Sequence, residues 1–432
     1  MTAAHLDLPI DETSRARLAA DGLTFRVVDT TSPADHADWS HAVNRGFLGP
    51  RMSDALTENR RLALDADRLV GVYDPTTPLS SEPVGTTHCW PADLTLPGGR
   101  TLGAWAVSGV TVAQTHRRRG IARALMEAEL RTAIALGLPV AMLTVSESTI
   151  YGRFGYAPAA LARDLTIATR RVRWTGPPVV GRVVHVSAEQ LRDEGHAIVE
   201  RVRVATPGEV SASATSHLWL RQLGLTFEHE NAKNLRFVRH DDADGVPQGY
   251  ATYQLVENEA DFTDHVLKLH ALVAATPEAY VALWRFVLDM DLVSTVTAHL
   301  RPVDEPLRWM IDDFRAVSIT ETDHLWVRVL DPRTALASRT YAAADRLVLT
   351  VEDGLGHAAG TWALETDEAG EAQVTEVDGP ADVTLSVNAL GSLLLGGGSA
   401  AIWAAAGQLR GEAERVDRLF RSPVAPFLST WF

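Results

Sequence analysis

The chain has 432 residues, of which 46% are hydrophobic and 22% charged, and this predicts a globular protein of two or three domains. The formal net charge of −15 argues against a nucleic-acid backbone as the main partner, because phosphate binding needs a basic surface, and it suits a cationic small molecule. The single cysteine, Cys89, excludes both an intrachain disulfide and a cysteine metal cluster.

No signal peptide is visible, since residues 1–9 carry neither a basic region nor an apolar run. We therefore expect a cytoplasmic protein, or one that is secreted by a route without a signal peptide. One uncharged stretch, Val383 to Gln408, is long enough to span a bilayer, which takes about 20 residues. Its polar residues and the run Gly396-Gly397-Gly398 favour a strand, a turn and a buried helix instead, so we expect no membrane span.

The first segment, residues 1–165, combines helical and strand patterns in the order typical of an α/β layer fold. Apolar spacing predicts helices over Asp35–Phe47, Leu56–Leu64 and about Gly120–Leu136, and strands over Val70–Tyr73, Gly85–Asp93, a segment that ends at Val112, and Val140–Val145. The last of these helices leaves directly from a loop of the phosphate-binding type.

That loop runs from Gln114 to Gly120 and contains the run Arg117-Arg118-Arg119. At a helix N-terminus, unpaired backbone N–H groups and the positive end of the helix dipole coincide, so a pyrophosphate binds well there. Gly120 lets the backbone approach the ligand closely, and the arginines can add charge-assisted contacts. The pattern differs from GxGxxG and from a Walker loop, which disfavours a hydride carrier and a nucleoside triphosphate. A solvated basic loop is the alternative, against which the flanking strand and amphipathic helix argue.

A second motif, Ser146 to Tyr156, follows the strand over 140–145 and holds two glycines that frame its aromatic residues. Tyr151 in this motif can donate a proton to a departing thiolate. A reference pKa of about 10 keeps its hydroxyl protonated near neutrality, while a thiol leaves with a pKa near about 8.5. A buried tyrosine with a purely structural role is the alternative.

Residues 166–315 form the second segment, for which the patterns predict two helices and a hairpin: Ala188–Ala205, Ala212–Leu223, and 235–240 paired with 250–256. A pseudo-repeat lies here, because the stretch from Leu272 to Trp284 resembles the stretch from Thr111 to Leu125. Both consist of a strand, Val-Ala-x-Thr and a helix, but the second copy lacks the Arg-Arg-Arg-Gly insertion. We expect two copies of one fold, of which only the first binds a phosphate; a chance match is the alternative.

The last segment, residues 316–432, is expected to hold strands over Leu325–Val329, Leu347–Val351, Gly360–Glu365 and Ala372–Val377, and helices over Ser399–Leu409 and Glu412–Phe420. The chain ends in Pro-Phe-Leu-Ser-Thr-Trp-Phe, and such an apolar end predicts a docked tail. The α-carboxylate of Phe432 would then be protected and able to accept a proton from an attacking amine. A docked tail without a catalytic role is the alternative.

No metal site is expected from the sequence. The run Asp241 to Gly245 lacks the spacing and the distant glutamate of a calcium loop and therefore predicts a turn. The 15 histidines include no HExxH pair. Cys89 has no visible partner, and we expect it to be buried.

Two motifs, Val110–Ala122 and Ser146–Pro158, resemble those of the GNAT acetyltransferase superfamily. More narrowly, Thr115-His-Arg-Arg-Arg-Gly and Ile150-Tyr-Gly-Arg-Phe-Gly-Tyr resemble the Eis (enhanced intracellular survival) family of actinobacterial aminoglycoside acetyltransferases. The resemblance covers the whole chain. It implies an α/β (α+β) fold that assembles as a homohexamer, with a GNAT domain over 1–165, a degenerate GNAT domain over 166–315 and a sterol carrier protein-like domain over 316–432.

The same resemblance implies the site residues. Tyr151 matches the general acid of the family, and the carboxylate of Phe432 matches its general base. Acetyl-CoA would contact the end of a strand, the following helix start and the second motif, at Val110, Thr111, Val112, Arg118, Arg119, Gly120, Ile121, Ala122, Arg123, Ser146 and Glu147. The penultimate residue, Trp431, stands where we expect an acidic residue in the best-known relatives, so the regiospecificity is not carried over.

The resulting hypothesis is an N-acetyltransferase that moves an acetyl group from acetyl-CoA directly to a primary amine of an aminoglycoside-type polyamine, without a metal. In one alternative the acceptor is a protein lysine or another polyamine. In the other, the chain is a lipid-binding protein with a vestigial acetyltransferase fold. Two features argue against this last possibility: the intact Arg-Arg-Arg-Gly run over 117–120, and the presence of Tyr151.

Overall fold

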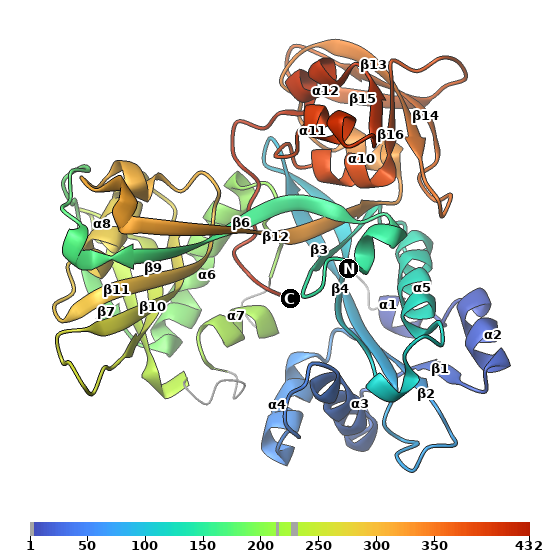
Figure 1. Cartoon of the computed structure of the whole chain (residues 1–432), viewed down its shortest axis with the longest axis horizontal. Helices are drawn as coiled ribbons and strands as arrows, with labels where there is room; N and C mark the ends of the chain where they lie inside the picture. The colour runs from blue at the N-terminus through green and yellow to red at the C-terminus, as the bar shows by residue number, and fades with distance from the viewer. Residues whose placement is uncertain (1–3, 213–215, 226–231) are drawn as a thin grey trace.

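The computed structural model describes residues 4–212, 216–225 and 232–432, which fold into three lobes (Figure 1). The first lobe lies at the lower right of the view, the second at the left and the third at the top. The last residues of the chain leave the third lobe and return to the junction between the lobes, where the C-terminus lies. The end of the chain therefore meets the first lobe near the centre of the molecule.

The first lobe is a sheet covered by helices. Its strands are β1 (Thr24–Val27), β2 (Arg68–Tyr73), β3 (Gly85–Leu96), β4 (Arg100–Val112) and β5 (Val140–Thr144), and its helices are α1 (Ala4–Asp7), α2 (Glu12–Ala20), α3 (Pro33–Gly46), α4 (Asp54–Ala63) and α5 (Ile121–Ala135). The start of α3 follows from local sequence, because Ser32 accepts a hydrogen bond from the N–H of Asp35 and Pro33 takes the first helical position. The predicted elements of this segment are confirmed, with ends shifted by a few residues.

Helix α5 is held between two apolar clusters of the first lobe. On one side Leu125 packs in a cluster with Val72, and on the other Met126 packs in a cluster with Trp105. Burial of a large apolar side chain stabilises the fold by about 1.5–3 kcal/mol. A rotation or shift of α5 would expose several of these side chains, so the start of the helix is held in place relative to the sheet.

The second lobe repeats the strand, helix, strand unit of the first. Its strands are β7 (Arg182–Val186), β8 (Leu235–Asp241), β9 (Pro247–Val256), β10 (His265–Ala274) and β11 (Val293–Arg301), and its helices are α6 (Ala188–Ala205), α7 (His217–Gln222) and α8 (Pro277–Leu288). The predicted hairpin is confirmed as β8 and β9, with a turn in which the N–H of Gly245 donates to the carbonyl of Asp242 (3.1 Å). Residues 213–215 of the helix predicted over 212–223 lie outside the described residues, and the described helix in this range is the shorter α7, which starts after Ser216.

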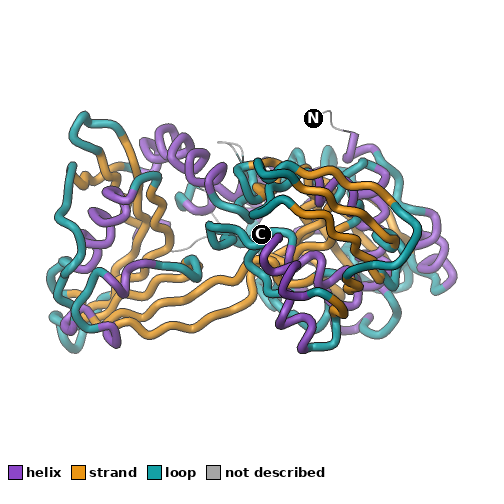
Figure 2. The backbone as a smooth tube through the Cα atoms, turned by 90° about the horizontal axis from the view of Figure 1, so that it is seen from above, coloured by secondary structure: helices purple, strands orange, loops and turns teal. Residues whose placement is uncertain are grey.

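Two long strands belong to both lobes. β6 (Ala157–Ala168) pairs with β11 and with β12 (Val317–Val329), and β12 also pairs with β5. In the part of the chain that the structure describes, the strands of both lobes form one 12-stranded sheet, with the order β1-β2-β3-β4-β5-β12-β6-β11-β10-β9-β8-β7. Figure 2 shows long strands that run between the lobes.

These shared strands bear on the expected domain limits. Residue 165 lies inside β6, and residues 317–329 form β12, whose main-chain hydrogen bonds tie it to the first two lobes. We propose that the third domain starts after β12, near Pro332, instead of at residue 316.

The third lobe has a separate sheet made of β13 (Asp345–Glu352), β14 (Gly360–Thr366), β15 (Ala372–Glu376), β16 (Val383–Ser386) and β17 (Leu409–Gly411). Their order is β15-β14-β13-β16-β17. The helices are α9 (Pro332–Ala337), α10 (Val387–Leu393), α11 (Ala400–Ala405) and α12 (Ala413–Phe420). Buried residues of this lobe and of the central strands of the first lobe form one apolar cluster, in which Leu390 packs with Val327 and Leu347.

The uncharged stretch from Val383 to Gln408 differs from its prediction. A strand is present, but it ends at Ser386, which caps α10 by accepting a hydrogen bond from the N–H of Ala389 (3.2 Å). The buried helix is therefore α10, which comes before the glycine run, whereas α11 after it is short and leaves Ile402 70% exposed. Among the described residues, no helix is both long and apolar enough to cross a membrane.

Candidate active site

The two central strands of the first lobe separate toward their C-terminal ends. β4 and β5 run parallel and pair only from Ala104 with Val140 to Ala106 with Met142. β4 continues to Val112 and stays paired with β3 on its other side, with a register shift near Gly109, whose φ is +59°. The edge of β4 that faces β5 is thus open beyond Ala106 among the described strands. Such an edge can form main-chain hydrogen bonds with an extended ligand.

The predicted residues Val110, Thr111 and Val112 lie on this open part of β4. The hydroxyl of Thr111 shares a hydrogen bond with the hydroxyl of Thr86 (2.6 Å). The Thr111 side chain also packs closely on Gly46 of α3, where an added Cβ would lie 2.4 Å from the Cβ of Thr111. The side chain of Thr111 is therefore committed to packing against α3. Only its main chain remains for a ligand.

The start of α5 has the geometry that the loop sequence predicts. Gly120 is the N-cap residue with φ +76°, a conformation that favours glycine, and no described side chain caps this end of the helix. A Cβ at Gly120 would have no atom within 4 Å, so the space in front of the helix is open. The first N–H groups of α5, at Ile121, Ala122 and Arg123, have no partner within the helix, and this end fits a pyrophosphate.

The arginines of this loop have different roles in the structure. The guanidinium of Arg119 pairs with Asp74 (Nη1 to Oδ2, 3.2 Å) and donates to the carbonyl of Asp21 (3.1 Å). Hydrogen bonds from Thr76, His116 and Arg119 lower the pKa of the Asp74 carboxyl, so it stays ionised and holds the loop. The Arg119 side chain is therefore bound by other protein groups, and only its main chain is available to a ligand.

Two further arginines lie at the same helix start. Arg118, with φ +65°, is exposed and lies beside the open helix end. Arg123 is exposed on the first turn of α5 and pairs with Glu127 (2.8 Å). Of these predicted side chains, Arg118 is the better placed to contact a phosphate.

Tyr151 begins the short 3-10 helix η2 (Tyr151–Phe154), which follows β5. Tyr151 is 6% exposed, and its ring packs edge to face on Tyr156, with ring centroids 6.3 Å apart. Burial, and then the negative charge of Glu147, raise the pKa of Tyr151 to about 12. The hydroxyl is therefore protonated at neutral pH, as a proton donor must be.

The C-terminal residue lies at the end of β5. The N–H of Phe432 donates to the hydroxyl oxygen of Thr144 (3.2 Å), and this hydroxyl donates in turn to the terminal oxygen of Phe432. The phenyl ring packs edge to face on Trp90 at 5.3 Å, and Phe432 as a whole is 7% exposed. The prediction of a docked tail is confirmed.

The residues before Phe432 are anchored on the second lobe and on β12. His324, which is 1% exposed, donates through Nε2 to the carbonyl of Thr430 (2.9 Å), and burial lowers its pKa to about 4, so it stays neutral. The ring of His324 also lies 5.1 Å from that of Trp431, and Arg221 of α7 donates to the Trp431 carbonyl. The position of the terminal carboxylate thus depends on contacts with both of the first two lobes.

A cavity of about 640 Å³ joins these groups. It contains Tyr151 and Phe432 together with Val110 and Ser146, so it brings together both proposed catalytic residues and two of the predicted cofactor residues. Its described lining also includes the penultimate Trp431, which departs from the pattern expected of the family, and residues that sequence reasoning did not single out: Val43, Asn44, Phe47, Pro50, Met52, Leu56, Arg60, Ala63, Leu64, His88, Val107, Ser108, Gly109, Thr144 and Arg221. The latter come from α3, α4, β3, β4, β5, α7 and the segments that follow α3 and α4, and no motif marks them.

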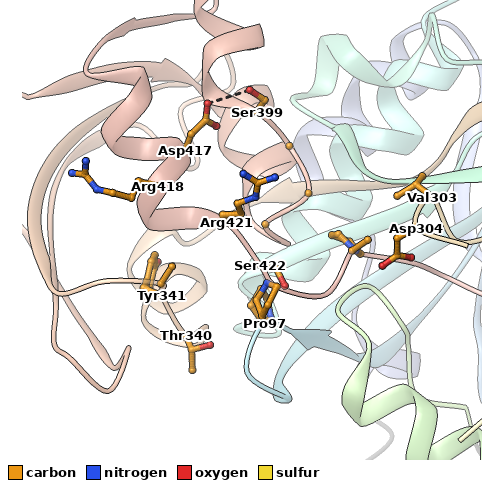
Figure 3. A pocket seen from close by; sticks show the side chains of 17 residues that line it. Pro97, Val303, Asp304, Thr340, Tyr341, Ser399, Asp417, Arg418, Arg421 and Ser422 are labelled. Atoms are coloured by element: carbon orange, nitrogen blue, oxygen red, sulfur yellow. Dashed lines mark hydrogen bonds between the residues drawn. The ribbon is translucent and has the colours of Figure 1, made fainter. Parts of the chain in front are cut away.

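A larger cleft, of about 1160 Å³, lies between the third lobe and the other two (Figure 3). Figure 3 shows Asp417 pointing toward Ser399, whose hydroxyl donates to it (3.1 Å), and the N–H of Ala401 donates to the same carboxylate (3.1 Å). Asp417 therefore stabilises the start of α11. The described lining of this cleft includes none of the predicted site residues, so the smaller cavity is the candidate active site.

The second lobe has the same strand geometry, but among its described residues a side chain occupies the opening between the strands. β10 and β11 run parallel, pair as far as Leu269 with Ala298 and then separate. Arg301 bridges this opening: it donates to the carbonyl of Leu272 (2.9 Å) and pairs with Glu305 (2.8 Å). In addition, the side chain of Thr276 caps the start of α8, whereas the start of α5, at Gly120, has no side-chain cap.

Glu209 anchors the tail from the second lobe and is expected to make stability depend on pH. Its two oxygens accept hydrogen bonds from the N–H and the hydroxyl of Ser429 (3.1 Å each), and burial raises its pKa to about 7 against an ordinary 4.5. Between these values the folded state binds the extra proton, so this residue's stabilisation is lost as pH rises from about 4.5 to about 7. The loss is on the order of 3 kcal/mol at most.

Thermal unfolding of the wild type and of Glu209→Gln at about pH 5 and about pH 8 measures this effect, because all other titrating groups are shared. The wild type should lose more stability than the variant on going to the higher pH. Equal losses in the two proteins would contradict the assignment.

Comparison with known protein families divides the chain in three. A model described as an acetyltransferase (GNAT) domain matches residues 27–159, and another of the same description matches residues 213–329. A sterol carrier protein domain model matches residues 332–429. The expected fold class, two GNAT domains followed by a sterol carrier protein-like domain, is confirmed.

Relatives match over nearly the whole chain. The N-acetyltransferase Eis of Mycobacterium tuberculosis is 34% identical over 394 residues, which cover 88% of this chain and 92% of that protein. An N-acetyltransferase of Streptomyces avermitilis, itself described as uncharacterized, is 34% identical over 412 residues, or 92% of this chain and 97% of its own.

Solved structures show the same arrangement of lobes. The crystal structure of Eis1 from Mycobacterium abscessus superposes with a TM-score of 0.80 at 29% identity and covers 94% of this chain and 100% of that one. A GCN5-related N-acetyltransferase from Anabaena variabilis has a TM-score of 0.79 at 18% identity, with 95% and 100% covered, and shares the fold.

Proposed function

The chain belongs to the Eis family of GNAT N-acetyltransferases, and from this premise we propose that it transfers the acetyl group of acetyl-CoA directly to a primary amine of an aminoglycoside-type polyamine. The observation that carries the proposal is the meeting of the Tyr151 ring and the Phe432 terminus in one cavity beside the open edge of β4. These two residues are far apart in the sequence, and together they give the cavity a proton donor and a proton acceptor.

In the proposed reaction the carboxylate of Phe432 accepts a proton from the amine, which must be neutral to attack. Thr144 holds this carboxylate at the end of β5. Bound acetyl-CoA supplies the thioester, and alignment of the two reactants beside β4 contributes to the rate by proximity. The hydroxyl of Tyr151 donates its proton to the sulfur of the departing thiolate.

The main chain at Val110, Thr111 and Val112 and the uncapped start of α5 would hold acetyl-CoA. The open edge of β4 suits the amide groups of the pantetheine arm, and the N–H groups from Gly120 to Arg123 suit the pyrophosphate. Arg118 is exposed where it can add a charged contact, and Ser146 and Glu147 follow directly after β5.

A panel of amines tests the acceptor. We expect mass spectrometry to detect an increase of one or more acetyl groups on aminoglycosides incubated with enzyme and acetyl-CoA, with matching release of CoA. A lysine peptide is the second candidate acceptor, which the apolar wall from Phe47, Met52 and Leu56 favours, since a lysine stem is apolar. Acetylation of the peptide alone would replace the aminoglycoside proposal. Absence of acetyl-CoA binding in calorimetry would favour the lipid-binding alternative with a vestigial acetyltransferase fold.

Assembly as a homohexamer and a cytoplasmic location are parts of the same proposal and rest on the family resemblance. Sedimentation equilibrium of the purified protein tests the assembly. A monomer at micromolar concentration would remove the hexamer from the proposal without affecting the chemistry above.

A further inference from the structure

The turn that carries Tyr151 receives a side chain from the third lobe. Asn388 lies in the first turn of α10, and its Nδ2 donates to the carbonyl of Gly152 and to the carbonyl of Tyr156, both at 2.8 Å. These carbonyls lie on either side of Gly155, which ends η2 with φ +87°. The two N–H groups of a single amide therefore hold both ends of this turn.

A second contact from the third lobe supports the same turn. Arg328 of β12 is fully buried, and its Nη2 pairs with Asp353 of the third lobe (2.7 Å). Its guanidinium lies against Gly155, where a Cβ would be 2.6 Å from Nε. Asp353 is itself held by the N–H groups of Leu355 (3.0 Å) and Ala358 (2.8 Å).

Polar contacts join the lobes at this turn, beside the apolar packing of α10 on β6 and β12. A cleft of about 500 Å³ lies between them and is lined by Gly152, Arg153 and Gly155 on one side and by residues such as Asp353 and Asn388 on the other. The cleft leaves room beside Gly152, where an added Cβ would have no atom within 4 Å, so loss of the Asn388 amide would remove a restraint on this part of η2. Any movement of η2 would also move the ring of Tyr151.

We propose that Asn388 is a positioning residue for proton donation by Tyr151, so that the third lobe controls the acid side of the reaction as well as supplying the terminus. The inference rests on the proposed role of Tyr151 as general acid. Asn388 touches no reacting group. It acts through the main chain of Gly152 and Tyr156, which flank the catalytic ring in the sequence.

The test compares Asn388→Asp, Asn388→Ala and Asn388→Gln with the wild type, using two acetyl donors. Asp has the same shape but places a carboxylate oxygen against two carbonyls, and Gln keeps the donor nitrogen on a longer stem. Asn258→Asp is the control, since Asn258 bonds within a surface loop of the second lobe. The donors are acetyl-CoA, whose thiolate needs a proton, and 4-nitrophenyl acetate, whose phenolate departs without one.

With acetyl-CoA, kcat should fall about tenfold to a hundredfold in Asn388→Asp and Asn388→Ala, since a misplacement of about 1 Å can cost a factor of about 100. With 4-nitrophenyl acetate the rate should change less than about threefold, KM for acetyl-CoA should stay within about twofold, and Asn388→Gln should recover part of kcat. Equal losses with both donors, or no loss, would overturn the proposal.

Two further comparisons keep the outcome decisive. If Asn388→Asp does not fold by circular dichroism, the donor dependence of Asn388→Gln decides, because a purely structural role would slow both donors equally. If Tyr151→Phe itself slows both donors equally, the proposed function fails at its acid step. A donor-dependent Tyr151→Phe with a donor-independent Asn388→Ala would instead reject only the positioning role.

Discussion

Deletion of Phe432 is expected to lower kcat by about 10²–10⁴-fold while acetyl-CoA binding measured by calorimetry stays within about twofold. The deletion moves the terminal carboxylate to Trp431, which is 42% exposed, and removes the residue whose main chain Thr144 holds. The amine would then lose its proton acceptor. The open edge of β4 and the start of α5 do not involve the tail, so the cofactor site should survive.

Three matched variants separate charge from packing at this terminus. Phe432→Leu keeps the carboxylate and should lose far less activity than the deletion. A C-terminal extension of two glycines keeps the phenyl ring but converts the carboxylate into an amide, and it should be as inactive as the deletion. Thr144→Val removes the hydroxyl that holds the terminus and should give an intermediate loss. Full activity of the extended protein would exclude the carboxylate as the base.

Replacement of Tyr151 by Phe is expected to lower kcat with acetyl-CoA by about 10²–10³-fold, in the lower half of the range for one general acid. The variant keeps the buried ring and its contact with Tyr156, so folding and KM should change little. Because burial raises the pKa of Tyr151 to about 12, the wild type should keep its acid through the weakly alkaline range. Its kcat should therefore show no alkaline decline below about pH 10 from this group.

Tyr156→Phe is the control for this experiment. Tyr156 packs on Tyr151 and is fully buried, but it does not line the cavity, so removal of its hydroxyl should leave kcat within about threefold. Steady-state rates of both variants against pH, with circular dichroism melts for folding, make the comparison. A Tyr151→Phe variant with wild-type kcat would mean that the thiolate leaves without this proton.

Much of the fold follows from local patterns in the sequence. Helix α6 has the predicted limits because Ser187 and Gln190 form a capping box at its start. The loop from Gln114 to Gly120 leads into α5 as expected, since Gly120 takes a left-handed conformation that few other residues adopt. In each case the cause lies within one turn of the chain.

In the uncharged stretch from Val383 to Gln408, local sequence patterns predict the wrong limits for the strand and the buried helix. In the stretch from Val383 to Leu395, the first residues alternate between apolar and polar, as in a strand, and the later ones are buried without interruption. Periodicity does not distinguish a strand from a helix in such a short apolar run. Here the strand β16 lasts only until Ser386, and α10 then packs against β6 and β12 of another lobe. Only that tertiary surface selects the helix.

Sequence reasoning reached the open helix start at Gly120, Tyr151 and the docked end at Phe432, because each carries its signal in neighbouring residues or in the composition of a terminus. Three contacts are visible only in the structure. Phe432 forms a hydrogen bond with Thr144, and Arg119 forms an ion pair with Asp74. Asn388 forms a hydrogen bond with the turn that carries Tyr151. These pairs are separated by up to 288 positions along the chain, and no periodicity or motif spans such a distance. The pairing of β12 with β5 and β6 and the return of the tail bring them together, so the site exists only after three separately patterned segments have packed on one another.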